Sequence, residues 1–189
     1  GLGVKPGDEV ITTAHSWIST SETITQAGAR VVFCDTDYDT FTIDPALIEA
    51  KITSRTVGII PVHLYGQPCD MDAIMAIARK HSLWVIEDCA QAIGARYKGR
   101  SVGGIGHAGA FSFCQDKIIT TGGEGGMLTT SDEAAWSCAW SYKDHGKSFD
   151  SMFHKQHPPG FRWLHESFGT NWRMTEMQAA IGRVQIAKL

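Results

Sequence analysis

The chain has 189 residues, of which 43% are hydrophobic, and its formal net charge is −3. A chain of this length and apolar content can bury a substantial core, so an ordinary globular protein is expected. The mildly acidic balance gives no electrostatic reason to expect a nucleic acid or an anionic membrane as a partner. No apolar run approaches the roughly 20 residues that a membrane-spanning helix requires.

The cysteines and the two ends of the chain give further expectations. The five cysteines are widely spaced and form no C-x-x-C pair, which indicates reduced thiols in a cytoplasmic protein. The chain starts with GLGVKPGDEVI, without an initiator Met, and ends in the helical pattern MTEMQAAIGRVQIAKL. We therefore expect further residues before Gly1 and after Leu189.

The first half of the chain alternates between strand and helix patterns. Short apolar runs predict strands at residues 9–13, 31–34, 57–62 and 83–87. Helices are expected at 19–27, at 46–52 after the cap Asp44 and the first-turn Pro45, and up to residue 81 after Asp70 or Asp72. Consecutive strand–helix–strand units require right-handed parallel crossovers, so an open α/β sheet is predicted.

The second half has fewer regular elements. A strand that ends at Ser112 and a strand at 127–130 are followed by a helix at 131–142 with Ser131 as its cap. Residues 143–168 show no clear period, and a loop of this length is usually functional or mobile. The last element is an amphipathic helix from Thr175.

A candidate site follows from the strand ends. Ligands of open α/β sheets bind at the carboxyl ends of the strands, where Asp88, Ser112 and Lys117 are expected. Lys117 precedes the glycine-rich turn TGGEGG, and burial beside other groups can activate a lysine for covalent chemistry. The alternative for Lys117 alone is a solvated side chain on a loop.

The polar residues near Lys117 suggest ligand contacts, and Asp88 and Gln91 each have a structural alternative. A buried carboxylate at Asp88 requires a cationic partner, for which a protonated pyridine nitrogen is suitable, or else it caps the following turn. Gln91 could reach a ligand hydroxyl or remain solvated. Ser112 and the glycines of the turn could donate to a phosphate. GGEGG does not match a P-loop, and no G-x-G-x-x-G opens a helix after a strand, so nucleotide hydrolysis and dinucleotide binding lose support.

Four stretches carry a resemblance to a known family. PVHLYGQPCDMDAI, EDCAQAIGARYKG, FSFCQDKIITTGGEGGML and NWRMTEMQAAIG are similar in order and spacing to the DegT/DnrJ/StrS sugar aminotransferases. These are pyridoxal-phosphate enzymes of the aspartate-aminotransferase fold (fold type I). The resemblance implies a three-layer α/β/α large domain with a mostly parallel mixed sheet at 1–170, without its N-terminal part, and a helix at 171–189 that leads toward a small C-terminal domain.

The resemblance also implies roles for individual residues. Lys117 would bind pyridoxal phosphate covalently and shuttle the proton, and Asp88 would pair with the pyridinium nitrogen. The other cofactor contacts would be Gln91 near the ring's phenolic oxygen, Ser112 at the phosphate, Trp17 on the ring face and Asn171 at the phosphate of the neighbouring subunit, which implies a homodimer with shared sites. His63 and Tyr65 are substrate candidates, with packing and turn support as the alternative. No metal ligand set is expected, because the histidines of the long loop lack the spacing.

The family's activity is the transfer of an amino group, here from glutamate, to a keto group of a nucleotide-linked deoxysugar for amino-sugar biosynthesis. Some members replace the lysine with histidine and dehydrate the sugar, and Lys117 argues against that branch. Two alternatives stay open at this point. One is a catalytically silent relative with a regulatory or assembly role, and the other is a nucleotide-binding α/β domain without covalent chemistry.

Overall fold

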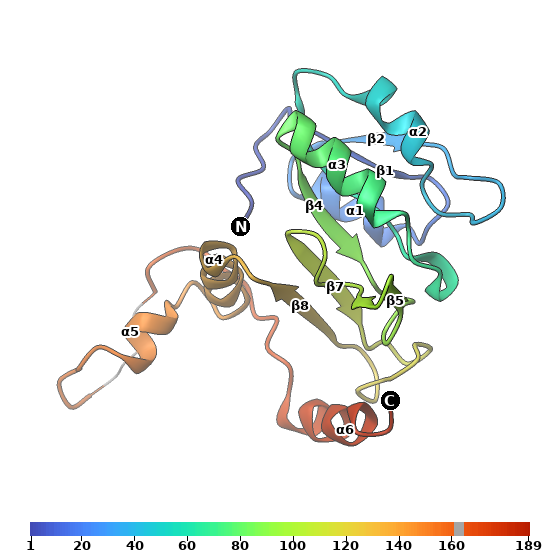
Figure 1. Cartoon of the computed structure of the whole chain (residues 1–189). Helices are drawn as coiled ribbons and strands as arrows, with labels where there is room; N and C mark the ends of the chain where they lie inside the picture. Colours follow the sequence, from blue (N-terminus) through green and yellow to red (C-terminus); the bar gives the residue numbers. More distant parts are fainter. Residues whose placement is uncertain (161–164) are drawn as a thin grey trace.

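The computed structural model describes residues 1–160 and 165–189. Its centre is a six-stranded sheet with the order β2-β1-β3-β4-β7-β8 (Figure 1). All neighbours pair in parallel except β7 and β8, which are antiparallel. The predicted mostly parallel mixed sheet is therefore confirmed. Its strands are β1 (Glu9–Thr13), β2 (Arg30–Cys34), β3 (Thr56–Ile60), β4 (Trp84–Asp88), β7 (Ala108–Ser112) and β8 (Gly126–Thr130).

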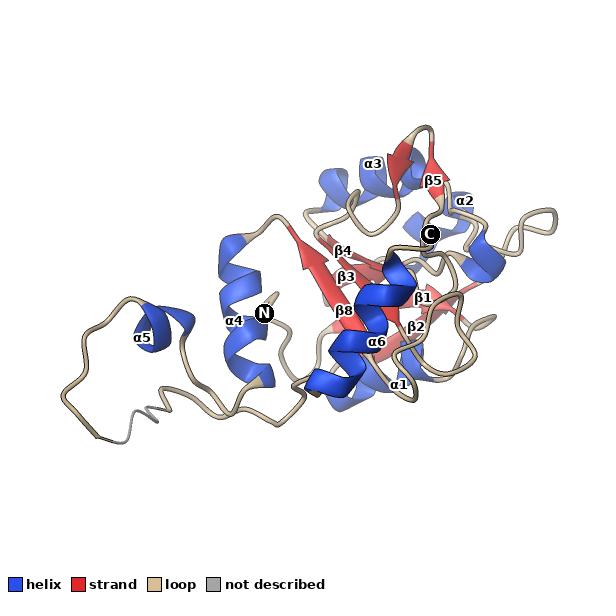
Figure 2. Cartoon of the chain, turned by 90° about the horizontal axis from the view of Figure 1, so that it is seen from below, coloured by secondary structure: helices blue, strands red, loops and turns tan. Residues whose placement is uncertain are grey.

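Helices cover both faces of the sheet, so the predicted three layers are present (Figures 1 and 2). A two-stranded hairpin, β5 (Arg96–Tyr97) and β6 (Arg100–Ser101), lies beside the main sheet. Among the described residues, no helix is both long and apolar enough to cross a membrane. The α-helices are α1 (Ser19–Gln26), α2 (Pro45–Ile48), α3 (Met71–His81), α4 (Glu133–Lys143), α5 (Phe149–Phe153) and α6 (Glu176–Ile186), and the 3-10 turns are η1 (Glu49–Lys51) and η2 (Leu64–Gly66).

Three helices, α2, α3 and α4, begin after an aspartate cap. The carboxylate of Asp44 accepts from the Ala46 N–H at 2.9 Å, and α3 begins after Asp70 rather than Asp72, because Asp70 accepts from the Ala73 N–H at 3.3 Å. The predicted cap of α4 was wrong. Asp132, not Ser131, accepts from the first backbone N–H groups of that helix. The predicted helix 46–52 is divided into α2 and η1.

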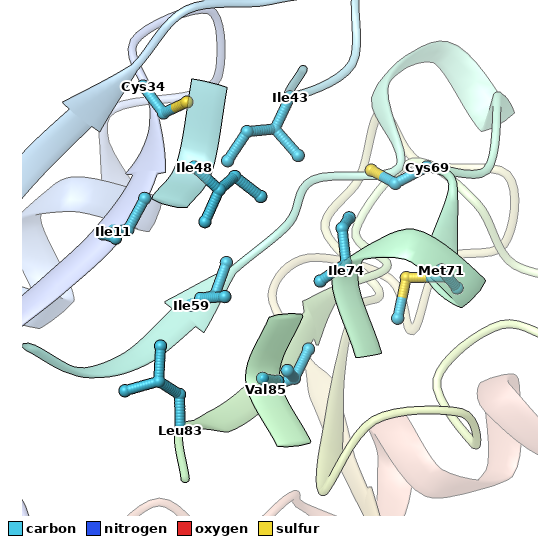
Figure 3. Close-up of a cluster of buried hydrophobic side chains, with 11 residues drawn as sticks. Ile11, Cys34, Ile43, Ile48, Ile59, Cys69, Met71, Ile74, Leu83 and Val85 are labelled. Carbon is cyan, nitrogen blue, oxygen red and sulfur yellow. The ribbon is translucent and has the colours of Figure 1, made fainter. Parts of the chain in front are cut away.

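The main core lies between the sheet and the layer of α2 and α3 (Figure 3). Ile48 from α2 and Ile74 from α3 are fully buried against Ile11, Ile59 and Val85 of the strands. A smaller cluster on the other face packs α1 against the same strands. Burial of apolar surface on both faces explains why the inner strands read as continuous apolar runs.

The segment expected to be a long loop contains a short helix. Ser148 caps α5 by accepting from the Ser151 N–H, and Phe149 of α5 packs edge-on against Trp136 and Trp140 of α4. The expectation of no regular structure was therefore wrong for Phe149–Phe153, while residues 161–164 lie outside the described part. The segment around α5 projects away from the sheet in both views (Figures 1 and 2).

Candidate active site

The candidate site lies where β4 and β7 end. These strands are parallel neighbours, and Asp88 pairs with Ala110. Since successive side chains of a strand alternate between faces, Asp88, Ala110 and Ser112 lie on the same face of the sheet. The structure thus brings the predicted carboxylate and the predicted hydroxyl to one edge and one face.

Hydrogen bonds orient the carboxylate of Asp88. Its Oδ1 accepts from the Ala90 N–H at 3.1 Å, and its Oδ2 accepts from the Thr20 hydroxyl at 2.7 Å. Its backbone is held as well, because the Asp88 N–H donates to the Pro61 carbonyl and the Asp88 carbonyl accepts from the His63 N–H. In the described structure β4 is followed by the strand β5 and not by a helix, so Asp88 does not cap a helix. Its carboxylate caps only the tight turn that contains Ala90. Sequence reasoning missed Thr20, because a threonine in the first turn of a helix carries no signal for a contact with a strand 68 positions away.

Gln91 and Tyr65 are joined at the same edge. The side-chain carbonyl of Gln91 accepts from the Tyr65 N–H at 2.7 Å, which supports the turn η2. The backbone φ of Tyr65 is 55°, an uncommon value for a residue with a side chain. Its ring is 72% exposed and meets the ring of His15 edge-on, with the ring centroids 6.1 Å apart. Tyr65 therefore presents an open aromatic surface beside Gln91.

Trp17 lies in the connection between β1 and α1. Its side chain is 71% exposed, so a face of the indole is free to stack on a planar ligand. Its carbonyl accepts from the Thr20 N–H at 3.1 Å, which ties Trp17 to the first turn of α1. Trp17 and Asp88 are thus connected through a single residue.

Lys117 follows the end of β7. Its N–H donates to the Cys114 carbonyl at 3.1 Å, and its side chain is partly buried. Within the described ranges, the ammonium of Lys117 has no hydrogen bond and no ion pair. Since buried charges are usually paired, a partly buried cation without a partner in the described part of the chain is the feature of this candidate site that points most directly to a ligand.

The glycine-rich turn after Lys117 is covered by α6. The Gln178 amide donates to the Glu124 carbonyl at 2.6 Å, and a Cβ on Gly122 would lie 2.7 Å from the side chain of Ile181. Gly122 also has a φ of 80°, which favours glycine. Close helix packing therefore explains this glycine without a ligand.

Asn171 lies outside the strands of the main sheet, in the segment between α5 and α6. It is exposed, forms a bridge with Asp144, and its side-chain oxygen accepts from Arg173 Nε at 3.2 Å. Asp144 itself is 8% exposed and pairs with Lys147 and Arg173. Burial alone would raise the pKa of Asp144, but the bond from Lys147 and the two cations hold this pKa below its ordinary value. Asn171 therefore contacts two charged residues, Asp144 and Arg173.

His63 lies behind the edge and is fully buried. Its Nδ1 accepts from the Cys69 N–H at 3.1 Å, so Nε2 carries the proton and donates to Glu87 Oε2 at 3.0 Å. Both ring nitrogens are therefore occupied. These contacts are those of the packing role that the sequence left open for His63.

Glu87, the immediate neighbour of Asp88, was missed by sequence reasoning. Its buried carboxylate accepts from the backbone N–H groups of Gly103, Ile105 and Gly106 at 2.7 to 2.8 Å, as well as from His63. Burial would raise the pKa of Glu87, yet these bonds hold it below its ordinary value. The signal was present in the dipeptide, because adjacent strand residues face opposite sides and only one of the two acids can face the site.

The side chains of His63, Glu87 and Cys89 approach one another within 4.8 Å, close enough to ask whether they hold a metal. The proton on His63 Nε2 points at Glu87, and burial raises the pKa of the Cys89 thiol far above its ordinary value. A metal ligand must lose these protons, so the cluster is better described as a hydrogen-bonded core.

Comparisons with known proteins identify the family and the fold of the chain. Residues 1–189 match the DegT/DnrJ/EryC1/StrS aminotransferase family. The GDP-perosamine synthase of Caulobacter vibrioides is 45% identical over 188 residues, which cover 100% of this chain and 48% of the relative. The crystal structure of an aminotransferase from Psychrobacter cryohalolentis has a TM-score of 0.97 and 60% identity, and the match covers 99% of this chain and 47% of that chain.

A further solved structure, NtdA from Bacillus subtilis, contains the bound cofactor PMP. It is 35% identical with a TM-score of 0.82, and the match covers 96% of this chain and 39% of that chain. The chain thus spans about half the length, or less, of the proteins that it matches. The expected fold class and the resemblance are both confirmed.

Proposed function

Because the chain belongs to the DegT/DnrJ/EryC1/StrS aminotransferase family, we propose that the complete protein is a pyridoxal-phosphate-dependent aminotransferase. Its reaction transfers an amino group from glutamate to a keto group of a nucleotide-linked deoxysugar. The observation that carries the proposal is the ammonium of Lys117, which has no hydrogen bond or ion pair among the described residues and follows the strand that ends at Ser112. The name of the relative from Caulobacter vibrioides, GDP-perosamine synthase, supports a nucleotide-sugar substrate.

The donor set fits this cofactor. Pyridoxal phosphate has an aldehyde, a basic ring nitrogen, a flat ring and a phosphate. Lys117 offers an amine, Asp88 an oriented carboxylate, Trp17 an exposed ring face and Ser112 a hydroxyl at the end of its strand. Each group of the cofactor therefore has a residue of suitable chemistry. Gln91, whose oxygen is used by Tyr65, still has its NH₂ to donate to the ring's phenolic oxygen.

When it is bound, the cofactor supplies an electron sink that stabilises negative charge on the substrate carbon. The protein's part is to hold the ring and to move protons. Asp88 would hold a proton on the ring nitrogen, which strengthens the ring's withdrawal of electrons. Lys117 would act as the general base and then the general acid at the substrate carbon.

We extend the proposal to a homodimer with shared sites. Asn171 is exposed and is held by its bridge to Asp144 and its bond with Arg173. A side chain displayed in this way is suited to reach the cofactor phosphate of a second copy. The five free cysteines support a reducing, cytoplasmic location. The division of the chain at residues 170 and 171 stays a prediction, and so does Tyr65 as a substrate contact.

The test compares the complete wild-type protein with Lys117→Ala and with Lys98→Ala, an exposed lysine paired with Asp72. Wild type and Lys98→Ala should retain visible cofactor absorbance and transfer amino groups from glutamate to nucleotide ketosugars. Lys117→Ala should lose both the covalent absorbance and turnover. Cofactor binding without transfer to any ketosugar would favour the catalytically silent relative, and binding of a nucleotide alone would favour the noncovalent α/β domain.

A further inference from the structure

We propose that Thr20 is a positioning residue that sets Asp88 and Trp17 relative to each other, so that the carboxylate meets the ring nitrogen while the indole lies on the ring face. The inference rests on the proposed function, because it concerns the cofactor that this function requires.

Thr20 is placed by burial and by hydrogen bonding. It is 6% exposed in the first turn of α1, and its hydroxyl donates to Asp88 Oδ2 at 2.7 Å. The Ser16 hydroxyl lies 2.8 Å from the Thr20 oxygen. Because Thr20 has only one hydroxyl proton and gives it to Asp88, Ser16 must be the donor in that pair. The result is a directed chain from Ser16 through Thr20 to Asp88.

This arrangement leaves Asp88 oriented but not saturated. An ionised carboxylate has about four acceptor positions, and the protein donors to Asp88 in the described structure are Thr20 and the Ala90 N–H. These bonds, one to each oxygen, fix the rotation of the carboxylate about its last side-chain bond. Acceptor capacity remains for a ring N–H.

The backbone of the same residue reaches Trp17. The Thr20 N–H donates to the Trp17 carbonyl at 3.1 Å, so one residue holds the carboxylate through its hydroxyl and the indole-bearing loop through its amide. The first turn of α1 and the end of β4 come from segments far apart in the sequence. Thr20 links them by hydrogen bonds at the site, and loss of its hydroxyl should release the Asp88 carboxylate from this link while the amide still holds Trp17.

The test measures binding of pyridoxal phosphate to the complete protein by absorbance titration. Thr20→Val removes the hydroxyl at nearly constant shape and should weaken binding about tenfold, the effect of losing one hydrogen bond to a charged group. Thr20→Ser keeps the hydroxyl and should bind like wild type. Thr23→Val is the matched control, since Thr23 is an exposed threonine of the same helix whose hydroxyl donates to the α1 backbone carbonyls of Ser19 and Thr20.

Two further measurements distinguish an effect of Thr20 on the position of the cofactor from an effect on the stability of the protein. The visible circular dichroism of the bound cofactor reports its orientation and should change in Thr20→Val, whereas the melting temperature of the apoprotein should stay close to that of Thr23→Val. In an Asp88→Ala background, Thr20→Val should have no additional effect on binding. If Thr20→Val does not fold, Thr20→Ala takes its place in the same cycle.

Wild-type binding by Thr20→Val would overturn the inference, and so would an equal loss in the Asp88→Ala background. Failure of the wild-type protein to bind pyridoxal phosphate would instead overturn the proposed function, and the inference with it. Weakened binding by Thr20→Val that Thr20→Ser restores would establish the role.

Discussion

The strand β4 ends in two adjacent carboxylates, Glu87 and Asp88, which face opposite sides of the sheet and have different surroundings. Glu87 faces the interior, is fully buried, and accepts from His63 and from three backbone N–H groups of the turn Gly103–Gly106. Asp88 faces the edge of the sheet, is partly buried, and accepts from Thr20 and Ala90 with capacity left over. The protein fills the hydrogen-bond acceptor positions of Glu87, whereas it orients Asp88 and leaves acceptor positions open.

This difference shows how a strand end can separate stability from chemistry. The saturated side anchors the turn at Gly103, where a φ of 80° suits glycine, and holds His63 in place. The oriented side keeps its remaining acceptor positions for a ligand. Because the two side chains point in opposite directions from one rigid strand, each can be changed with little effect on the other.

The largest expected effect is on turnover in Asp88→Asn. The amide keeps the shape of the side chain but cannot hold a proton on the cofactor's ring nitrogen, so turnover should fall by at least about a hundredfold, as for loss of one electrostatic contact to the transition state. The free energy of unfolding should change by less than about 1 kcal/mol. Steady-state kinetics and urea unfolding measure the two quantities. Unchanged turnover would count against the assigned role.

The next effect is on stability in Glu87→Gln. The new NH₂ group would face N–H donors that now bond a carboxylate oxygen, which leaves buried donors unpaired and should lower the free energy of unfolding by about 3 kcal/mol. Glu22→Gln is the matched control, because Glu22 is exposed on α1, and its change should stay within about 0.5 kcal/mol. Equal stabilities of the two variants in urea would show that the Glu87 contacts contribute little.

The smallest effect concerns the pH dependence of stability. The folded-state pKa of Glu87 lies below its ordinary value of 4.5, so its contribution is fully present above that value and is lost as the pH falls through the folded-state pKa. The difference in unfolding free energy between wild type and Glu87→Gln should therefore be largest near neutral pH and should shrink below 4.5. Unfolding curves across this range would contradict the assignment if the difference stayed constant.

Local patterns predicted much of the fold. The caps Asp44 and Asp70 act through backbone N–H groups two or three residues away, so the sequence contains both partners. Ser131 was the wrong cap because Asp132 competes for the same N–H groups from the next position. The helix at Phe149 was missed because its support is an aromatic contact with α4, which no sequence period shows.

By itself the sequence determined the alternation of strands and helices, the mostly parallel sheet and the placing of Asp88 and Ser112 at its edge, since these depend on periodicity and chain order. Only the tertiary structure decided that Glu87 is saturated, that His63 is buried and that Thr20 joins Asp88 to the first turn of α1. Those contacts join residues 24 and 68 positions apart. Distances of this kind are set by how layers pack, and a linear pattern contains no record of them.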